Sequence, residues 1–185
     1  TPQILDVLHL IIQGFVVPLK SQHISFCYEY LAPLLTFYGL EKYYGSLFKC
    51  LSQVAISAPG IASKLASVTL QICQEPNETT ALLFDFALDL VTLLSEAEFY
   101  SFQVVLYQRI TKFLKNSQFA NVALRPFEDS SLCANIVSNS GIAKQFVVPA
   151  LQNAIVACPD PTLSSRFISA MQIVSGQPTS WFVSM

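Results

Sequence analysis

Few side chains in this sequence belong to the types that carry out catalysis. There are two histidines, His9 and His23, and we expect the first within one helix and the second in the first turn of the next. Either imidazole, placed beside the thiol of Cys27, would form the base and nucleophile of a thiol hydrolase. No motif supplies a third group to orient the imidazole. We therefore expect a protein that is not an enzyme, and the thiol hydrolase is the alternative.

Acidic side chains occur in pairs on two of the predicted helices. Asp85 and Asp89 lie one helical turn apart. Glu96 and Glu98 stand at the start of the following helix. Paired carboxylates perform general acid–base catalysis in some enzymes. Two acids so close on one helix are more often solvated groups on an exposed face, and we interpret both pairs in that way.

The five cysteines stand singly along the chain, at positions 27, 50, 73, 133 and 158. None belongs to a C-x-x-C pair, so the motifs of zinc and redox sites are missing from the sequence. With six glycines in all, the chain also lacks the glycine-rich loops that hold phosphates. We therefore expect reduced, buried thiols in an intracellular compartment, with no metal and no cofactor.

The composition excludes several classes of protein. Of the 185 residues, 52% are hydrophobic and only 12% are charged, so an unusually large part of the surface must be apolar or covered. The longest stretch without a charged residue, 167–185, is interrupted by glycine and proline. No segment of about 20 apolar residues is therefore available to span a membrane. The net charge of −2 contains no long run of one sign, which disfavours a nucleic-acid partner.

Hydrophobic residues recur three and four positions apart almost throughout the chain, which indicates helices. Ser95 followed by Glu98 is a capping box, and Asp160 caps a helix whose first residue is a proline. We expect Pro126 to interrupt one segment and Pro149 to kink another. The helices that we expect cover residues 1–17, 21 to about 33, 41–56, 61–74, 77–94, 96–115, a broken segment 118–139, 141–157 and 161–176.

The expected helix pairs recur at a regular spacing. They start near Thr1, Glu41, Asn77, Gln118 and Asp160, about 40 residues apart, which is the period of HEAT and armadillo repeats. We therefore predict an all-α fold, an α-solenoid of HEAT-like helical hairpin repeats. Residues 1–185 would form a single domain, a fragment of a longer solenoid. Each repeat in a solenoid packs on its neighbours, so the exposed ends of a fragment would account for the high apolar content.

A possible binding site lies at the start of the second predicted helix. Lys20 and His23 bracket its cap, Ser21, and so place positive groups beside the positive end of the helix dipole. Together with free backbone N–H groups they would form a seat for a carboxylate or phosphate. Val7 and Ile11, four residues apart on the preceding helix, would line an apolar groove beside it. The alternative interpretation is that no binding site exists here: Lys20 is a solvated lysine, His23 is a turn histidine, and Val7 and Ile11 are core residues.

The same region resembles a known family. Residues 11–23, IIQGFVVPLKSQH, are similar to the I-I-N-G-F-A-L-P-L-K-x-x-H segment of the B-prime regulatory subunits of protein phosphatase 2A. The resemblance continues through residues 30–34 (YLAPL), 98–99 (EF), 106–109 (LYQR), 118–119 (QF) and 135–139 (NIVSN). It covers nearly the whole chain and corresponds to about the second half of a longer subunit.

The resemblance implies a HEAT-like regulatory subunit that binds the scaffold and catalytic subunits of the phosphatase and docks substrates through a short L-x-x-I-x-E motif. By position, Val7 and Ile11 would line the pocket for the isoleucine of the motif. Lys20 and His23 would supply positive charge beside its acidic or phosphorylated residues. We expect such a protein in the cytoplasm, and in the nucleus as a second location. The alternative is a HEAT-like adaptor that serves another partner.

Two segments depart from the family pattern. Residues 70–74 (LQICQ) stand where the family has an L-L-K-Y-W-P stretch. Residues 125–129 (RPFED) stand where it has Y-Y-W-N-N-E. Both aromatic patches are lost, and we therefore transfer no phosphatase-contacting residues from the family to this chain.

Overall fold

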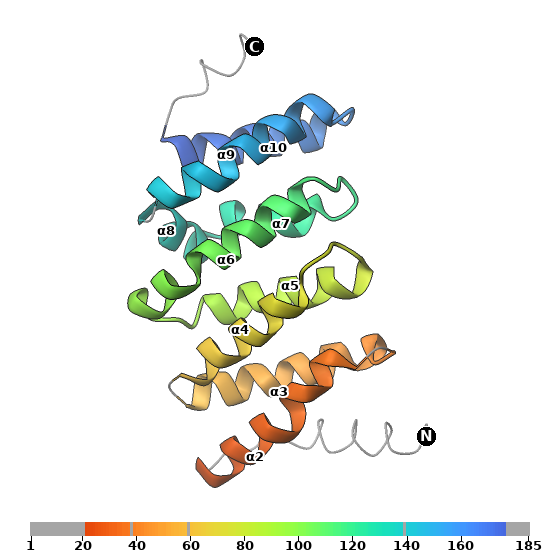
Figure 1. Ribbon diagram of the computed structural model, residues 1–185, viewed down its shortest axis with the longest axis vertical. Helices are drawn as coiled ribbons and strands as arrows, with labels where there is room; N and C mark the ends of the chain where they lie inside the picture. The colour runs from red at the N-terminus through yellow and green to blue at the C-terminus, as the bar shows by residue number, and fades with distance from the viewer. Residues whose placement is uncertain (1–20, 38, 59, 139, 177–185) are drawn as a thin grey trace.

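The computed structural model describes residues 21–176, apart from residues 38, 59 and 139, and shows helices stacked along one long axis (Figure 1). In chain order the elements are α2 (Ser21–Leu31), the 3-10 helices η1 (Ala32–Thr36) and η2 (Glu41–Tyr43), α3 (Tyr44–Ser57), α4 (Ile61–Ile72), α5 (Glu78–Val91), α6 (Glu96–Leu114), α7 (Ala120–Glu128), α8 (Ser130–Ser138), α9 (Ser140–Ala157) and α10 (Pro161–Ser175). This described part contains no β-strand, so the predicted all-α fold is confirmed. The helix predicted over residues 1–17 lies outside the described residues.

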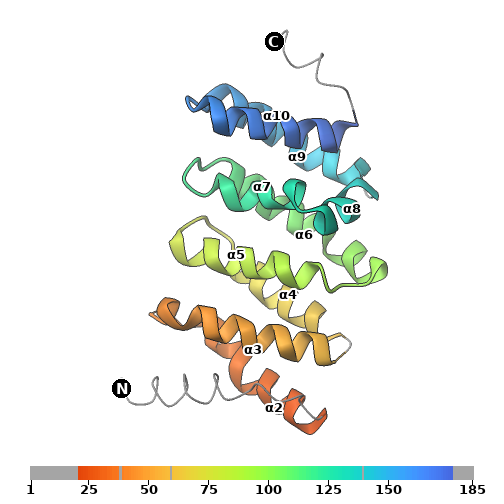
Figure 2. The ribbon, with the colours of Figure 1, turned by 180° about the vertical axis from the view of Figure 1, so that it is seen from behind.

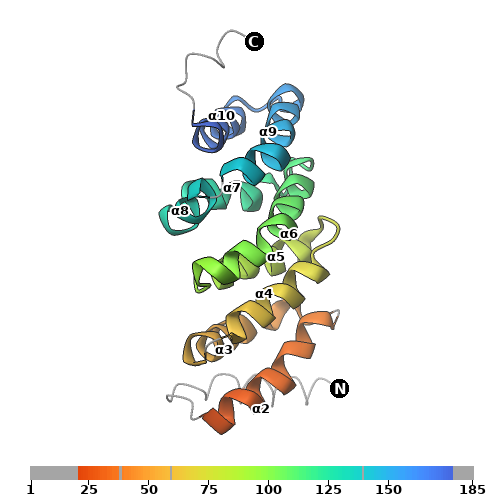
Figure 3. The ribbon, with the colours of Figure 1, turned by 60° about the vertical axis from the view of Figure 1, so that its left-hand side comes forward.

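The helices form two layers that face each other along the stack. Helices α2, α4, α6 and α9 make one layer, and α3, α5, α7 and α10 make the other, as Figures 1 and 2 show from opposite sides. The view in Figure 3 shows the two layers side by side, with the short helix α8 beside α7. From α3 onward, each helix of the two layers contacts its hairpin partner and at least one adjacent helix of its own layer, which is the architecture of an α-solenoid. No helix of the described stack has both the length and the apolar character needed to cross a membrane.

The predicted repeat length is correct, but the predicted pairing of helices is wrong. Packing is most extensive between α4 and α5 and between α9 and α10, so α5 and α10 complete hairpins that begin one helix earlier. The positions predicted to open a repeat, near Glu41, Asn77, Gln118 and Asp160, instead precede the second helix of each hairpin. The repeat length is about 40 residues whether a given helix is counted as the first or the second of its hairpin. Only the contacts between helices decide which neighbours pair.

Local capping chemistry sets several helix starts where the sequence predicts them. Ser95 accepts a hydrogen bond from the backbone N–H of Glu98, whose carboxylate accepts one from the Ser95 N–H at 3.0 Å. Asn77 and Thr80 form a second reciprocal capping box at the start of α5. Asp160 caps α10 by accepting from the N–H of Thr162 at 2.9 Å. These contacts satisfy backbone N–H groups that lack a partner within the helix.

One predicted break falls slightly later than expected. Pro126 lies inside α7, and the chain leaves the helix at Asp129, whose backbone is extended. A proline near the end of a short helix removes one hydrogen bond while the following turn still closes: here the Asp129 N–H donates to the carbonyl of Arg125. Pro149 also lies inside a helix, α9, as predicted.

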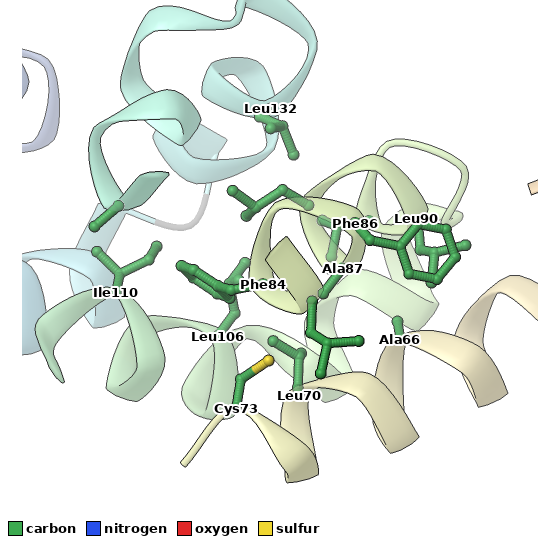
Figure 4. Packing of buried hydrophobic residues seen from close by; sticks show 14 of the residues in the cluster. Ala66, Leu70, Cys73, Phe84, Phe86, Ala87, Leu90, Leu106, Ile110 and Leu132 are labelled. Atoms are coloured by element: carbon green, nitrogen blue, oxygen red, sulfur yellow. The ribbon is translucent and has the colours of Figure 1, made fainter. Parts of the chain in front are cut away.

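The core is apolar and runs continuously through the stack. Leu70 of α4, Cys73 directly after this helix, Phe84 of α5 and Leu106 of α6 gather where three helices meet (Figure 4). The ring of Phe84 stacks on Phe113 of α6 with 4.7 Å between ring centroids. Since α5 and α6 belong to successive hairpins, these contacts bury apolar surface between repeats as well as within them.

Four cationic side chains on α6, α7 and α10 donate hydrogen bonds to groups of the preceding repeat. We call these residues, Arg109, Lys112, Arg125 and Arg166, the cation ladder. Arg109 Nε on α6 donates to the carbonyl of Leu70 at the end of α4, at 2.9 Å. Lys112 Nζ, one turn further along α6, donates to the carbonyl of Gln74 at 2.9 Å and to a carboxylate oxygen of Glu75 at 2.5 Å. Both cations therefore hold the C-terminal end of α4, where a helix dipole favours positive charge.

The ladder continues through the other layer. Arg125 on α7 donates to the carboxylates of Asp85, at 2.6 Å, and Asp89 on α5. Arg166 on α10 donates twice to Glu128 of α7, at 2.7 and 2.9 Å. Hydrogen bonds to carboxylates raise the pKa of Arg166 and, against the opposing effect of partial burial, also that of Arg125. Each contact joins residues 36 to 40 positions apart, which is about one repeat.

The buried ring of Phe84 provides a test of the core between repeats. We expect Phe84→Ala to lower the free energy of unfolding of the full chain by about 3–5 kcal/mol, because it removes a fully buried aromatic side chain and leaves a cavity. Urea denaturation followed by circular dichroism measures this change. Tyr100→Ala, at a position 64% exposed, is the matched control and should be nearly neutral. A loss below about 1 kcal/mol for the first variant would contradict this packing.

The contact of Lys112 with Glu75 predicts a pH-dependent stability. The hydrogen bond from Lys112 lowers the pKa of Glu75 in the folded state, so this contribution is present above the ordinary pKa of a glutamate and is lost as pH falls through the lowered value. We therefore expect Lys112→Met to reduce the melting temperature more at about pH 7 than at about pH 3.5. Thermal unfolding across this range measures the difference. The exposed Lys115 gives the control variant Lys115→Met, and an effect of Lys112→Met that does not change with pH would refute the assignment.

Candidate functional site

The predicted peptide-binding residues lie at the edge of what the structure describes. Val7, Ile11 and Lys20 lie outside the described residues. His23 is the third residue of α2, so its backbone lies in the first turn of this helix as predicted, and its side chain is not described. The site formed by these four residues therefore stays a prediction.

The helix that carries His23 belongs to the continuous stack. Helix α2 packs against α3 and continues into η1, and it buries Ile24, Cys27 and Leu31 along one side. Ser25, Glu29 and Tyr30 are exposed. The apolar stripe orients the helix on its neighbours and leaves the other side of α2 on the surface.

The environment of Cys27 disfavours a role as a nucleophile. Its side chain is only 3% exposed, and burial raises the pKa of its thiol. A reactive cysteine needs the opposite, a lowered pKa and access for a substrate. The thiol hydrolase alternative therefore loses its nucleophile.

The remaining cysteines are also structural. All five are reduced thiols; Cys50 and Cys73 are buried, and Cys133 and Cys158 are half-buried. Burial raises the pKa of Cys73 to about 12, against a smaller opposing effect of Arg109. In the part of the chain that the structure describes, no three histidine, cysteine or acidic side chains come together in a way that would hold a metal ion.

Three of these four acidic side chains, Asp85, Asp89 and Glu98, have partners in the structure, and this corrects the interpretation from sequence for them, whereas Glu96 is exposed as predicted. Asp85 and Asp89 are about half exposed, and both bind Arg125 of the next hairpin. Glu98 is part of the capping box of α6, where hydrogen bonds from Ser95 lower its pKa. The spacing of Asp85 and Asp89 could not reveal their partner, because Arg125 lies 36 to 40 residues later in the sequence. None of the three carboxylates is arranged for acid–base catalysis.

Two grooves open between successive repeats, one at each end of the helices. The first has a volume of about 670 Å³ and lies between η1 and the turn from α4 to α5; Phe37, Ile72 and Leu83 form apolar parts of its lining, and Glu75 and Glu78 form acidic parts. The second, of about 740 Å³, lies between the turn from α3 to α4 and the turn from α5 to α6.

Sequence reasoning did not identify these grooves. Ile56 and Leu93, which line the second groove, are 64% and 41% exposed. One indication in the sequence that Ile56 and Leu93 are exposed is their position next to predicted turns. An apolar residue at a helix end is not always covered by the next element. Scattered exposed apolar residues are common on proteins, so this signal alone does not specify a binding site.

Comparison with known proteins connects this stack to one family. The family model for the protein phosphatase 2A regulatory B subunit (B56 family) matches residues 1–177. The chain is 28% identical, over 82% of its length, to the B' kappa isoform of the 57 kDa regulatory subunit of serine/threonine protein phosphatase 2A from Oryza sativa subsp. japonica. It is 30% identical, over 83% of its length, to the serine/threonine-protein phosphatase 2A regulatory subunit psrA of Dictyostelium discoideum.

A third relative, the B' alpha isoform of the 57 kDa regulatory subunit of the same phosphatase from Arabidopsis thaliana, is 27% identical over 83% of the chain. The matches cover 30%, 25% and 32% of the lengths of these three relatives. The chain thus spans between a quarter and a third of each relative, and the match to the family model extends over most of its own length. The chain belongs to the B56 family of regulatory B subunits of protein phosphatase 2A.

Proposed function

We propose that this chain is part of a non-catalytic regulatory and substrate-targeting subunit that assembles with the scaffold and catalytic subunits of protein phosphatase 2A. The match of the family model to residues 1–177 is the observation that carries this proposal. The names of the relatives describe regulatory subunits of the same phosphatase. The buried thiol of Cys27 and the structural ion pairs of Asp85 and Asp89 are consistent with a chain that performs no chemistry itself.

The mechanism would be positional. A solenoid that holds both a substrate motif and the catalytic subunit raises the effective concentration of the substrate's phosphosite at the catalytic centre. The inter-repeat contacts of the cation ladder support such a role, because they hold each repeat in a defined position relative to the one before it. The cytoplasm, with the nucleus as a second location, is the compartment that we propose for this activity.

The substrate motif in this proposal is a short acidic peptide of the L-x-x-I-x-E type. Val7 and Ile11 would contact its isoleucine, and Lys20 and His23 would attract its acidic or phosphorylated positions. The support is the similarity of residues 11–23 to the family segment and the position of His23 in the first turn of α2. A positive site at the start of a helix suits a carboxylate or a phosphate.

Co-precipitation tests the assembly. We expect the full-length protein to retain both the scaffold and the catalytic subunit, because the chain belongs to a family of regulatory subunits of this phosphatase. Phosphatase activity in the precipitate measures whether the catalytic subunit is present and active. Retention of neither subunit would favour the other candidate, a HEAT-like adaptor that uses the same stack for a different partner.

Peptide titration tests the predicted site. We expect the double substitution Lys20→Ala, His23→Ala in the full-length protein to weaken an L-x-x-I-x-E peptide by roughly 1 to 3 kcal/mol, through loss of charge-assisted contacts. Fluorescence anisotropy or calorimetry measures the affinity. Lys144→Ala, at an exposed lysine of α9, is a control that removes one charge elsewhere. Equal affinities of the double variant and the unmodified protein would exclude these residues from the site.

A further inference from the structure

The last hairpin of the described stack, α9 with α10, is joined to the hairpin before it by two unequal contacts. Helix α9 packs on α6 in one layer, and α10 packs on α7 in the other (Figures 1 and 2). The packing of α9 on α6 is the most extensive between successive hairpins of the described stack, and that of α10 on α7 is less extensive. Since α9 and α10 also pack extensively on each other, the hairpin can turn as one body about its better-packed contact.

Neutral groups form the contact between α6 and α9. The hydroxyl of Thr111 on α6 donates a hydrogen bond to the carbonyl of Phe146 on α9, at 3.1 Å. The neighbouring side chains Ile110 on α6 and Val147 on α9 are fully buried. Apolar burial and a hydrogen bond between neutral groups involve no net charge, so screening by salt does not weaken them as it weakens an ion pair. This contact therefore stays in place when charges are screened.

An ion pair joins α10 to α7 at the surface. Nε and Nη2 of Arg166 donate to the two carboxylate oxygens of Glu128, at 2.7 and 2.9 Å, and Nη1 donates to the side-chain oxygen of Asn121 at 2.5 Å. Two parallel hydrogen bonds make a stronger and more directional pair than a single contact. The side chains of Arg166 and Glu128 are 36% and 46% exposed, so dissolved ions can screen their attraction.

Apolar packing is incomplete beside this ion pair. A hollow of about 230 Å³ is lined by Leu114 of α6, Ala150 and Ala154 of α9 and Phe167 of α10. Side chains around a hollow lack part of the contacts that a close-packed core provides. Phe167 directly follows Arg166 in the sequence. The ion pair therefore fastens α10 at a place where apolar packing holds it less firmly.

We propose that the Arg166–Glu128 ion pair is a latch that holds the last described hairpin against the one before it, with the contact between α6 and α9 as the hinge. When the pair is screened or broken, α10 moves away from α7 while α9 stays on α6. An exposed ion pair changes an equilibrium by up to about fivefold, so the latch shifts populations of a closed and an open junction.

The opening changes the relative position of the groups on the two sides of the junction. In the regulatory subunit proposed above, it would change the distance between partners bound before and after α9. This consequence rests on the proposed function, whereas the latch itself does not. Distances within the chain therefore test the latch independently of whether the protein retains the phosphatase.

Spin labels on both layers measure the opening. Exposed positions on α5 and α10, Leu82→Cys and Ser165→Cys, report on the layer with the ion pair. Exposed positions on α4 and α9, Gln71→Cys and Gln152→Cys, report on the layer with the hinge. Each pair is placed in the full chain after the two half-buried cysteines are replaced by serine. Pulsed electron spin resonance gives the distribution of distances between the two labels.

We expect Arg166→Gln to lengthen the mean distance between α5 and α10 by about 2 Å and to leave the distance between α4 and α9 unchanged. We expect the same change in the chain with Arg166 intact when NaCl is raised to about 1 M, because the screening length then falls to about 3 Å. Lys144→Gln removes a charge from an exposed position of the same hairpin. It is the matched control and should change neither distance.

Exchange of the two charges provides a rescue. Glu128→Arg places two cations together and should lengthen the distance between α5 and α10 further, whereas the double variant Arg166→Glu, Glu128→Arg should return it to the value of the unmodified pair. The salt series requires no substitution in the ion pair, so it decides the question even where a variant does not fold. A distance between α5 and α10 that does not respond to salt, or an equal change in both layers, would overturn the latch.

Discussion

Burial of apolar helix faces between successive hairpins is the interaction on which the rest of this structure depends. A single hairpin cannot cover its own apolar surface, so each repeat is stable only against its neighbours. Phe84 and Phe113, which stack across two successive hairpins, show how this burial passes from one repeat to the next. The same constraint accounts for the composition, because a stack with an uninterrupted core needs many apolar residues and leaves room for few charges.

Eight of the 22 charged residues make contacts of the cation ladder between repeats. Exposed ion pairs stabilise proteins only slightly, so the importance of the cation ladder lies in the position that each contact sets. The two segments that depart from the family pattern both take part in it: the carbonyls of Leu70 and Gln74 accept from α6, and Arg125 and Glu128 connect α5, α7 and α10. Both segments therefore have a structural role in joining repeats.

The fold, the family and the chemistry of the side chains agree with one another. In the described residues, the thiols are buried or half-buried, and the carboxylates of Asp85, Asp89 and Glu98 serve as ion-pair partners or helix caps. In this chain of the B56 family, these side chains therefore have structural roles.

The helical fold, the length of the repeat and most helix starts could be predicted from the sequence, because these depend on local patterns: apolar spacing, caps such as Ser95 and Asp160, and turns. The sequence also identified the family through residues 11–23. Only the tertiary contacts show which helices pair and that Asp85 and Asp89 share Arg125. These features join residues about one repeat apart or depend on what surrounds a side chain, and a local pattern contains no information on either.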